Sequence, residues 1–479
     1  MKKWIVLPIL LLFIATVALA QKTKQPELPR KGHSIHIKLD NYAEKELYLG
    51  YYYGDKQYLR DTAIRNPQGY FVFEKEEELP GGMYLLVMPP NNEYFQMLIS
   101  PGEQHFTLES DAKNIADKMK VSGSPDNKLL YDYLQFLAQR RPLADTLRAR
   151  IERSNEAQKN QLQRELDKLN EEVTNFQQKI ITQHSNTLTA AIVRANQQLD
   201  MPDFEGDEQS VQNQRWRYTQ QHFFDNFNLA DPRMLRTPFL FERVDFFVNK
   251  LQVQHPDTLA KAVDMVLTQM KPAEEAFKYY LIHFVNFFAK SNYVGMDAVY
   301  VYLVEKYYAT GQAPWTDEEQ LQKMVENALG LKPTLIGKIA PNIEVQKRDG
   351  SKIALHDVKA NYTILYIWKY DCGVCKKSTP IIKDFYEKYK DQGVQIFAIC
   401  YQFGSDATPC WEYVDEAGVK DWIHTVDLQN RSRYRDWYYV RSTPQIYILD
   451  SKKEIISKRI GAEQLNDVME TILEMKRSK

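Results

Sequence analysis

Residues 362–380 read YTILYIWKYDCGVCKKSTP and hold the two features that decide the fold of the C-terminal part of the chain. The run Tyr362–Trp368 is apolar and rich in β-branched and aromatic residues, which is typical of a buried strand. Cys372-Gly373-Val374-Cys375 begins four residues after this strand and opens a predicted helix. The segment therefore predicts a buried strand that leads into a cysteine pair at a helix N-terminus.

The segments around this stretch alternate between strands and helices. Strands are predicted at residues 362–368, 394–400, 445–449 and 454–460, and helices at residues 380–389, 411–417 and 463–476. Such alternation indicates an α/β sheet with both faces covered. The preceding boundary lies near Gly337-Lys338-Ile339-Ala340-Pro341, so we expect this domain to span residues 337–479.

The cysteine pair has the spacing required for redox chemistry. Two cysteines separated by two residues on a first helical turn bring their sulfur atoms within bonding distance. Unpaired N–H groups and the positive end of the helix dipole favour thiolate over thiol. We therefore expect Cys372 to be the exposed nucleophile that attacks a disulfide, and Cys375 to be the buried thiol that resolves the mixed disulfide.

A Cys-x-x-Cys pair is also half of many zinc sites. The other two cysteines do not form a second such pair, and no His-x3-5-His occurs among the nine histidines. We therefore predict neither a metal nor a cofactor.

Several marks together make residues 337–479 resemble the thioredoxin superfamily, in particular its exported TlpA-like branch. The marks are the opening Gly337-Lys338-Ile339-Ala340-Pro341, the strand end Ile367-Trp368, the motif Cys372-Gly373-Val374-Cys375-Lys376-Lys377, Pro380, and Ser442-Thr443-Pro444. The resemblance implies a thioredoxin-like fold and thiol-disulfide exchange with other proteins, and it favours reduction over oxidation.

The resemblance also implies a substrate-binding group made of Thr443, Pro444 and Trp368. In the family the proline that matches Pro444 is cis and lies against the active-site disulfide, where the backbone before it pairs with the incoming peptide. A cis X-Pro bond costs only about 0.5–1 kcal/mol relative to trans. The alternative is an ordinary trans proline at a strand start.

Other positions depart from the family pattern and are expected to tune the site. Tyr366 stands where ordinary thioredoxins have a buried aspartate, and Ser378 stands where many TlpA-like reductases have a glutamate. Asp371 replaces the usual tryptophan before the first cysteine. Its carboxylate should oppose thiolate formation, whereas Lys376 and the adjacent lysine should favour it.

Cys400 ends a predicted strand, and Cys410 lies in the loop that follows. A structural disulfide is one possibility for this pair. Two free thiols and a second redox pair that relays electrons are the others. Peroxidase chemistry is the nearest enzymatic rival, but the Pro-x-x-x-Thr-x-x-Cys signature of peroxiredoxins is absent.

The N-terminus predicts export. Lys2 and Lys3 precede an apolar run to Leu19, and small residues stand before Gln21, so residues 1–20 read as a cleavable signal peptide. An uncleaved anchor is the alternative. No cysteine follows the cleavage site, which argues against a lipid anchor, so we expect a periplasmic or secreted protein without a membrane span after cleavage.

Two further modules precede the α/β domain. Residues 21–33 read as a linker, and residues 34–112 show period-two alternation with turn signals, which predicts a small antiparallel β-sandwich. Residues 120–332 show helical periodicity, including one long amphipathic helix at residues 151–183 that packs on a neighbouring helix or pairs as a coiled coil in a homodimer. The fold class is therefore multidomain: a β domain, an all-α middle domain and an α/β thioredoxin-like domain.

Composition excludes a nucleic-acid partner. Lys and Arg total 62 against 63 Asp and Glu, a net charge of −1, so there is no basic footprint. The expected partners are protein thiols or disulfides and a redox partner in the envelope. A binding or scaffold protein that keeps a thioredoxin fold without turnover is the competing hypothesis, since one fold hosts many functions.

Overall fold

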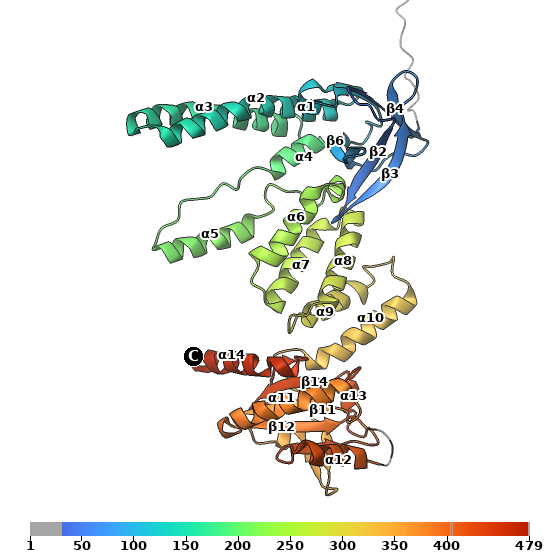
Figure 1. Ribbon diagram of the computed structural model, residues 1–479, viewed down its shortest axis with the longest axis vertical. Coiled ribbons are helices and arrows are strands. Elements are labelled where there is room, and N and C mark those ends of the chain that lie inside the picture. Colours follow the sequence, from blue (N-terminus) through green and yellow to red (C-terminus); the bar gives the residue numbers. More distant parts are fainter. Residues whose placement is uncertain (1–30, 403, 405, 478–479) are drawn as a thin grey trace, which may run out of the picture.

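The computed structural model describes residues 31–402, 404 and 406–477 (Figure 1). The predicted signal peptide and most of the predicted linker lie outside the described residues. Within the described part of the chain, no helix is both long enough and apolar enough to cross a membrane.

Two four-stranded sheets form the N-terminal part of the chain. One sheet has the order β4-β1-β7-β8, with bounds Tyr70–Lys75, His33–Asp40, His105–Asp111 and Lys120–Ser122. The other has the order β3-β2-β5-β6, with bounds Lys56–Ile64, Glu46–Tyr53, Gly82–Met88 and Glu93–Ile99. Alternate residues such as Ile35 and Ile37 are fully buried between the sheets, as period two requires. The predicted antiparallel pattern holds except between β1 and β7, which are parallel because β7 returns beside β1 after the chain has crossed the other sheet.

The long helix predicted at residues 151–183 is wrong at its start. The structure has two helices here, α2 (Pro125–Arg153) and α3 (Glu156–Gln183), which lie side by side as a hairpin (Figure 1). The break occurs because Asn155 caps α3 by accepting a hydrogen bond from the backbone N–H of Gln158. The apolar stripe of α3, with Leu162 and Leu166 buried, packs on α2 of the same chain. The apolar residues of α3 are therefore buried within one chain, without a second copy of the protein.

The remaining helices of the middle region fit the helical periodicity predicted for residues 120–332. They are α4 (Leu188–Ala195), α5 (Glu208–His222), α6 (Pro238–Phe246) with a π-helical turn over Phe247–Leu251, α7 (Pro256–Met270), α8 (Glu274–Ala289), α9 (Asp297–Leu303) with a π-helical turn over Val304–Tyr308, and α10 (Glu318–Leu331). The buried faces of α4 and of α6 to α10 join those of the β strands in one continuous apolar core, whereas α5 has no buried residue.

The C-terminal part is a seven-stranded sheet of order β10-β9-β13-β12-β11-β14-β15. The strands are β9 (Glu344–Lys347), β10 (Lys352–Ala354), β11 (Tyr362–Trp368), β12 (Val394–Cys400), β13 (Ile423–Val426), β14 (Gln445–Asp450) and β15 (Ile455–Lys458). Central strand β11 is parallel to β12, antiparallel to β14 and buried along its whole length. This explains its unbroken apolar sequence.

The two faces of this sheet have separate cores. Alternate β11 residues such as Tyr366 face α11 (Gly373–Tyr389), α12 (Thr408–Ala417) and α14 (Leu465–Arg477). The intervening residues such as Leu365 face α13 (Tyr434–Trp437) and the segment around Leu355. The sheet is thus covered on both faces, as the alternation of elements predicted.

Candidate active site

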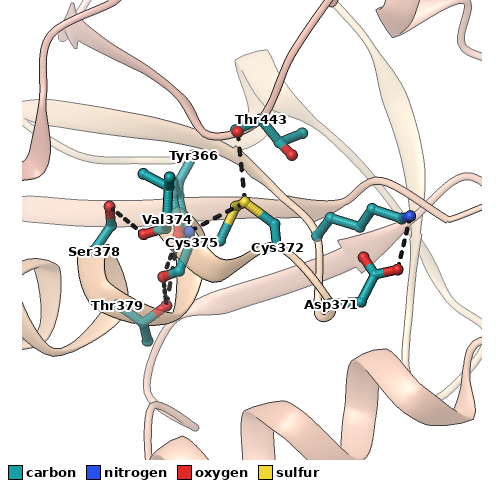
Figure 2. The surroundings of a disulfide bond; sticks show 9 residues. Tyr366, Asp371, Cys372, Val374, Cys375, Ser378, Thr379 and Thr443 are labelled. Carbon is teal, nitrogen blue, oxygen red and sulfur yellow. Dashed lines mark hydrogen bonds and ion pairs between the residues drawn. A yellow bond between two sulfur atoms is a disulfide. The ribbon is translucent and has the colours of Figure 1, made fainter.

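Cys372 and Cys375 lie at the start of α11 and are joined by a disulfide. Their Cα atoms are 5.2 Å apart, which the first turn of a helix imposes on this spacing. Cys372 is the N-cap residue, and its Sγ accepts a hydrogen bond from the backbone N–H of Cys375 at 3.1 Å (Figure 2). Cys375 is fully buried, whereas Cys372 is partly exposed. A substrate can therefore reach the first sulfur and not the second.

The fold brings the Thr443-Pro444 peptide, which is cis, against this disulfide. The carbonyl oxygen of Thr443 lies 3.5 Å from Sγ of Cys372, across 71 positions of sequence (Figure 2). Thr443 and Pro444 are half-buried, and Val374 on the opposite side is 60% exposed. The partly exposed Cys372 thus lies between the helix start and the cis-proline loop.

Tyr366 forms the floor of the site from β11. Its hydroxyl lies 3.4 Å from the carbonyl oxygen of Cys375 and 3.4 Å from Oγ1 of Thr379 (Figure 2). Burial raises the pKa of this phenol well above its ordinary value, so it stays protonated and can donate but cannot act as a base. Ser378 donates to the carbonyl oxygen of Val374 at 2.9 Å. Both hydroxyls therefore support the helix backbone and do not contact the sulfur atoms.

The carboxylate of Asp371 is held by Lys369 at 2.9 Å (Figure 2). This hydrogen bond raises the pKa of Lys369, so the lysine keeps its charge. The sequence left open whether Asp371 or Lys376 dominates the field at Cys372. Lys369 compensates part of the charge of Asp371 locally, and Lys376 is exposed beside the helix start.

Trp368 does not lie on the surface, so the predicted substrate contact does not fit the structure. The side chain is 3% exposed. Its ring lies 6.4 Å from that of Tyr366 and 5.1 Å from that of Tyr413 on α12. Trp368 is therefore a core residue beneath the site, because the strand end turns its side chain inward.

Cys400 and Cys410 form a second disulfide, which removes the free-thiol alternative and leaves a structural bond or a second redox pair. Their side chains are 2% and 0% exposed. Cys400 ends β12 and pairs with Trp368 in the sheet register, and Cys410 lies in the first turn of α12. The bond therefore ties α12 to the sheet beside the active-site floor. The described residues contain neither a free cysteine nor a group of three metal-ligating side chains.

Sequence reasoning missed two residues of this floor. Thr379 donates to the carbonyl oxygen of Cys375 at 3.0 Å, and its position four residues after Cys375 on a helix could have identified it. Tyr413 has no local signal, since its contact with Trp368 depends on how α12 packs on the sheet.

Three family patterns match the chain. The AhpC/TSA family matches residues 336–457. Two domain families of unknown function match the earlier parts, DUF5106 at residues 154–330 and DUF4369 at residues 33–130.

The thiol-disulfide oxidoreductase ResA of Bacillus cereus is 31% identical over 145 residues, which are 29% of this chain and 77% of the relative. The chain belongs to this thiol-disulfide oxidoreductase family. ResA of Bacillus thuringiensis is 30% identical over 138 residues, which are 29% of this chain and 76% of the relative. The C-terminal domain is thus a thioredoxin-like domain of an oxidoreductase related to the TlpA and ResA proteins.

Solved structures of similar proteins include a domain of a possible thiol-disulfide isomerase from Cytophaga hutchinsonii. It is 32% identical, covers 30% of this chain and 97% of its own, and has a TM-score of 0.28. A thioredoxin-like protein from Bacteroides caccae is 17% identical, covers 57% of this chain and 98% of its own, and has a TM-score of 0.42.

Proposed function

We propose that this oxidoreductase reduces disulfides of partner proteins in the cell envelope, with Cys372 as nucleophile and Cys375 as resolving thiol. The observation that carries the proposal is the cysteine pair at a helix N-terminus, with the exposed sulfur facing a cis-proline loop. The helix start supplies an N–H donor to Sγ of Cys372, which stabilises a thiolate more than a thiol.

The reaction follows from the different exposure of the two sulfurs. The Cys372 thiolate attacks one sulfur of a substrate disulfide, forming a mixed disulfide and releasing the other substrate sulfur as a thiolate, which takes a proton. Cys375 then loses its proton and attacks Sγ of Cys372, which forms the internal disulfide and releases the second substrate thiol. Two electrons pass from the protein to the substrate; of the two protons that the substrate thiolates take up, one comes from Cys375 and the other from solvent, because Cys372 begins as a thiolate. A dithiol reductant must reverse the change in the protein before the next turnover.

The substrate is proposed to bind at Thr443 and Pro444, whose backbone lies beside the reacting sulfur. Backbone pairing at this loop accepts polypeptides of varied sequence, since main-chain groups are common to all of them. Asp371, Lys376, Ser378 and Tyr366 are proposed to tune the site through charge and through the helix backbone, because none of their side chains has a hydrogen bond to a sulfur atom among the described residues.

Two observations support an envelope location. The N-terminal residues have the pattern of a signal peptide. The buried Cys400–Cys410 disulfide is of the kind that persists in oxidising compartments.

Insulin reduction in the presence of dithiothreitol tests the proposal. The wild-type chain should accelerate precipitation of the insulin B chain, and Cys372→Ala should remove the acceleration. The matched control is Cys400→Ala/Cys410→Ala, which deletes the other cysteine pair and should stay active. Equal activity of wild type and Cys372→Ala would instead support a scaffold protein that keeps the fold without turnover.

A further inference from the structure

The segment just before the cis-proline loop is held from two sides. Tyr438 is fully buried in the thioredoxin-like domain and donates from its hydroxyl to the carbonyl oxygen of Pro341 at 2.7 Å. Val440 is 9% exposed, and its N–H donates to the carbonyl oxygen of Arg435 at 2.9 Å. Tyr439, between them, packs instead against the core shared by the helical region and the β-sandwich. Three consecutive residues therefore link the thioredoxin-like domain to the core of the helical region and the β-sandwich.

The partner of Tyr439 is Gly330 on α10, the helix that leads into the thioredoxin-like domain (Figure 1). A Cβ placed on Gly330 would lie 2.3 Å from Cδ2 of Tyr439, so the ring lies directly on the helix backbone. The guanidinium of Arg441 lies 4.3 Å from the ring centroid. Only glycine at position 330 leaves room for this contact.

The backbone of Tyr439 shows that the contact constrains the chain. Its φ is 44°, in the left-handed region that costs a residue with a Cβ about 1–2 kcal/mol. Such a conformation persists where the surrounding structure over-determines it. Here the buried neighbours on one side and α10 on the other supply that constraint.

The strand after the loop is tied to the same region. Lys458 on β15 forms an ion pair with Asp297 at the start of α9, and its side chain is 2% exposed. β15 pairs with β14, which begins directly after Pro444. The helical region therefore holds the chain both before and after the cis-proline loop.

We propose that the helical region positions the cis-proline loop for polypeptide substrates through the contact between Gly330 and Tyr439. The inference rests on the proposed function, because it concerns the loop that would bind the substrate backbone. Tyr439 lies four residues before Thr443, whose carbonyl oxygen is 3.5 Å from Sγ of Cys372. A shift of Tyr439 is therefore transmitted to the surface against which a peptide pairs, while the cysteines at the start of α11 stay in place. Gly330 and Tyr439 are positioning residues and do not take part in the chemistry.

Two disulfide substrates separate this role from simple domain packing. Insulin needs the loop, because its backbone must pair there, whereas 5,5′-dithiobis(2-nitrobenzoic acid) has no peptide backbone and reports only on the Cys372 thiolate. In Gly330→Ala the added methyl displaces the Tyr439 ring, although alanine by itself favours the helix by about 1 kcal/mol. Tyr439→Gly removes the ring and accepts the positive φ without strain.

We expect each variant of the reduced full chain to lose about tenfold in kcat/KM with insulin, mainly through KM, while the rate with the small disulfide stays within about twofold. The double variant should be no worse than either single variant, because both break the same contact. Leu329→Ala is the matched control, since Leu329 is the 57% exposed neighbour on the same helix.

Unchanged insulin kinetics in both variants would overturn the inference and leave the proposed function intact. An equal loss with both substrates would also overturn it, because it would mean general damage to the site. If the wild-type protein reduced neither substrate, the proposed function and the inference would both be overturned.

Discussion

The second disulfide makes a quantitative prediction about stability. Replacing both Cys400 and Cys410 by alanine removes a bond between residues separated by 10 positions. In the chain-entropy description, closing a loop of this size lowers the entropy of the unfolded chain enough to stabilise the fold by about 3 kcal/mol. Because the bond ties α12 to the end of β12, we expect the loss to fall on the thioredoxin-like domain.

Hydrogen exchange measured by mass spectrometry reads this domain separately from the rest of the chain. A loss of about 3 kcal/mol corresponds to roughly a hundredfold faster exchange of the slowest amides in β11 and β12. Amides of the β-sandwich should be unaffected, since they belong to a different core. The variant Cys372→Ala/Cys375→Ala is the control, because it keeps the second bond.

Unchanged exchange in β11 and β12 would refute the structural role of the bond. Full stability with loss of insulin reduction would point instead to the relay pair that the sequence left open.

Three further predictions concern single groups of the thioredoxin-like domain. Tyr366→Phe should lower the free energy of unfolding by at most about 1 kcal/mol, which denaturant titration measures. It should leave the pH profile of insulin reduction below pH 10 unchanged, because burial raises the pKa of the phenol and the group does not ionise there. Asp371→Asn should speed iodoacetamide alkylation of reduced Cys372 at about pH 6, by less than tenfold since Lys369 already compensates the carboxylate; slower alkylation would contradict the sign. Burial lowers the pKa of His424, so the neutral ring stabilises the fold above about pH 6.5 and this contribution is lost on acidification. The melting temperature of this domain should therefore fall less in His424→Gln than in the wild type between about pH 7.5 and about pH 5.5. An equal fall in both proteins would argue against this role of His424.

The active site could be anticipated from sequence because its parts depend on local rules. A Cys-x-x-Cys pair after an apolar strand fixes the helix N-terminus and the order of exposure, and both are present in the structure. Thr443-Pro444 was recognisable only by resemblance, since nothing local states that it meets Cys372 across 71 residues.

The errors and omissions have physical causes. The helix at residues 151–183 was started too early because the polar run from Glu152 to Asn155 contains no proline or glycine to mark a break, whereas the cap at Asn155 starts a new helix. Strands β9, β10 and β13 have three or four residues each, too few for a periodic signal. The contact of Tyr439 with Gly330 joins two domains and has no sequence signature at all.

Mass spectrometry of a trapped intermediate tests the division of roles between the two cysteines most directly. Reduced Cys375→Ala incubated with a disulfide-bonded peptide should accumulate a covalent adduct of one peptide chain, and fragmentation should place it on Cys372. Reduced Cys372→Ala should form little adduct, because Cys375 is fully buried. A stable adduct on Cys375, or none on Cys372 when the peptide is in excess, would contradict the account.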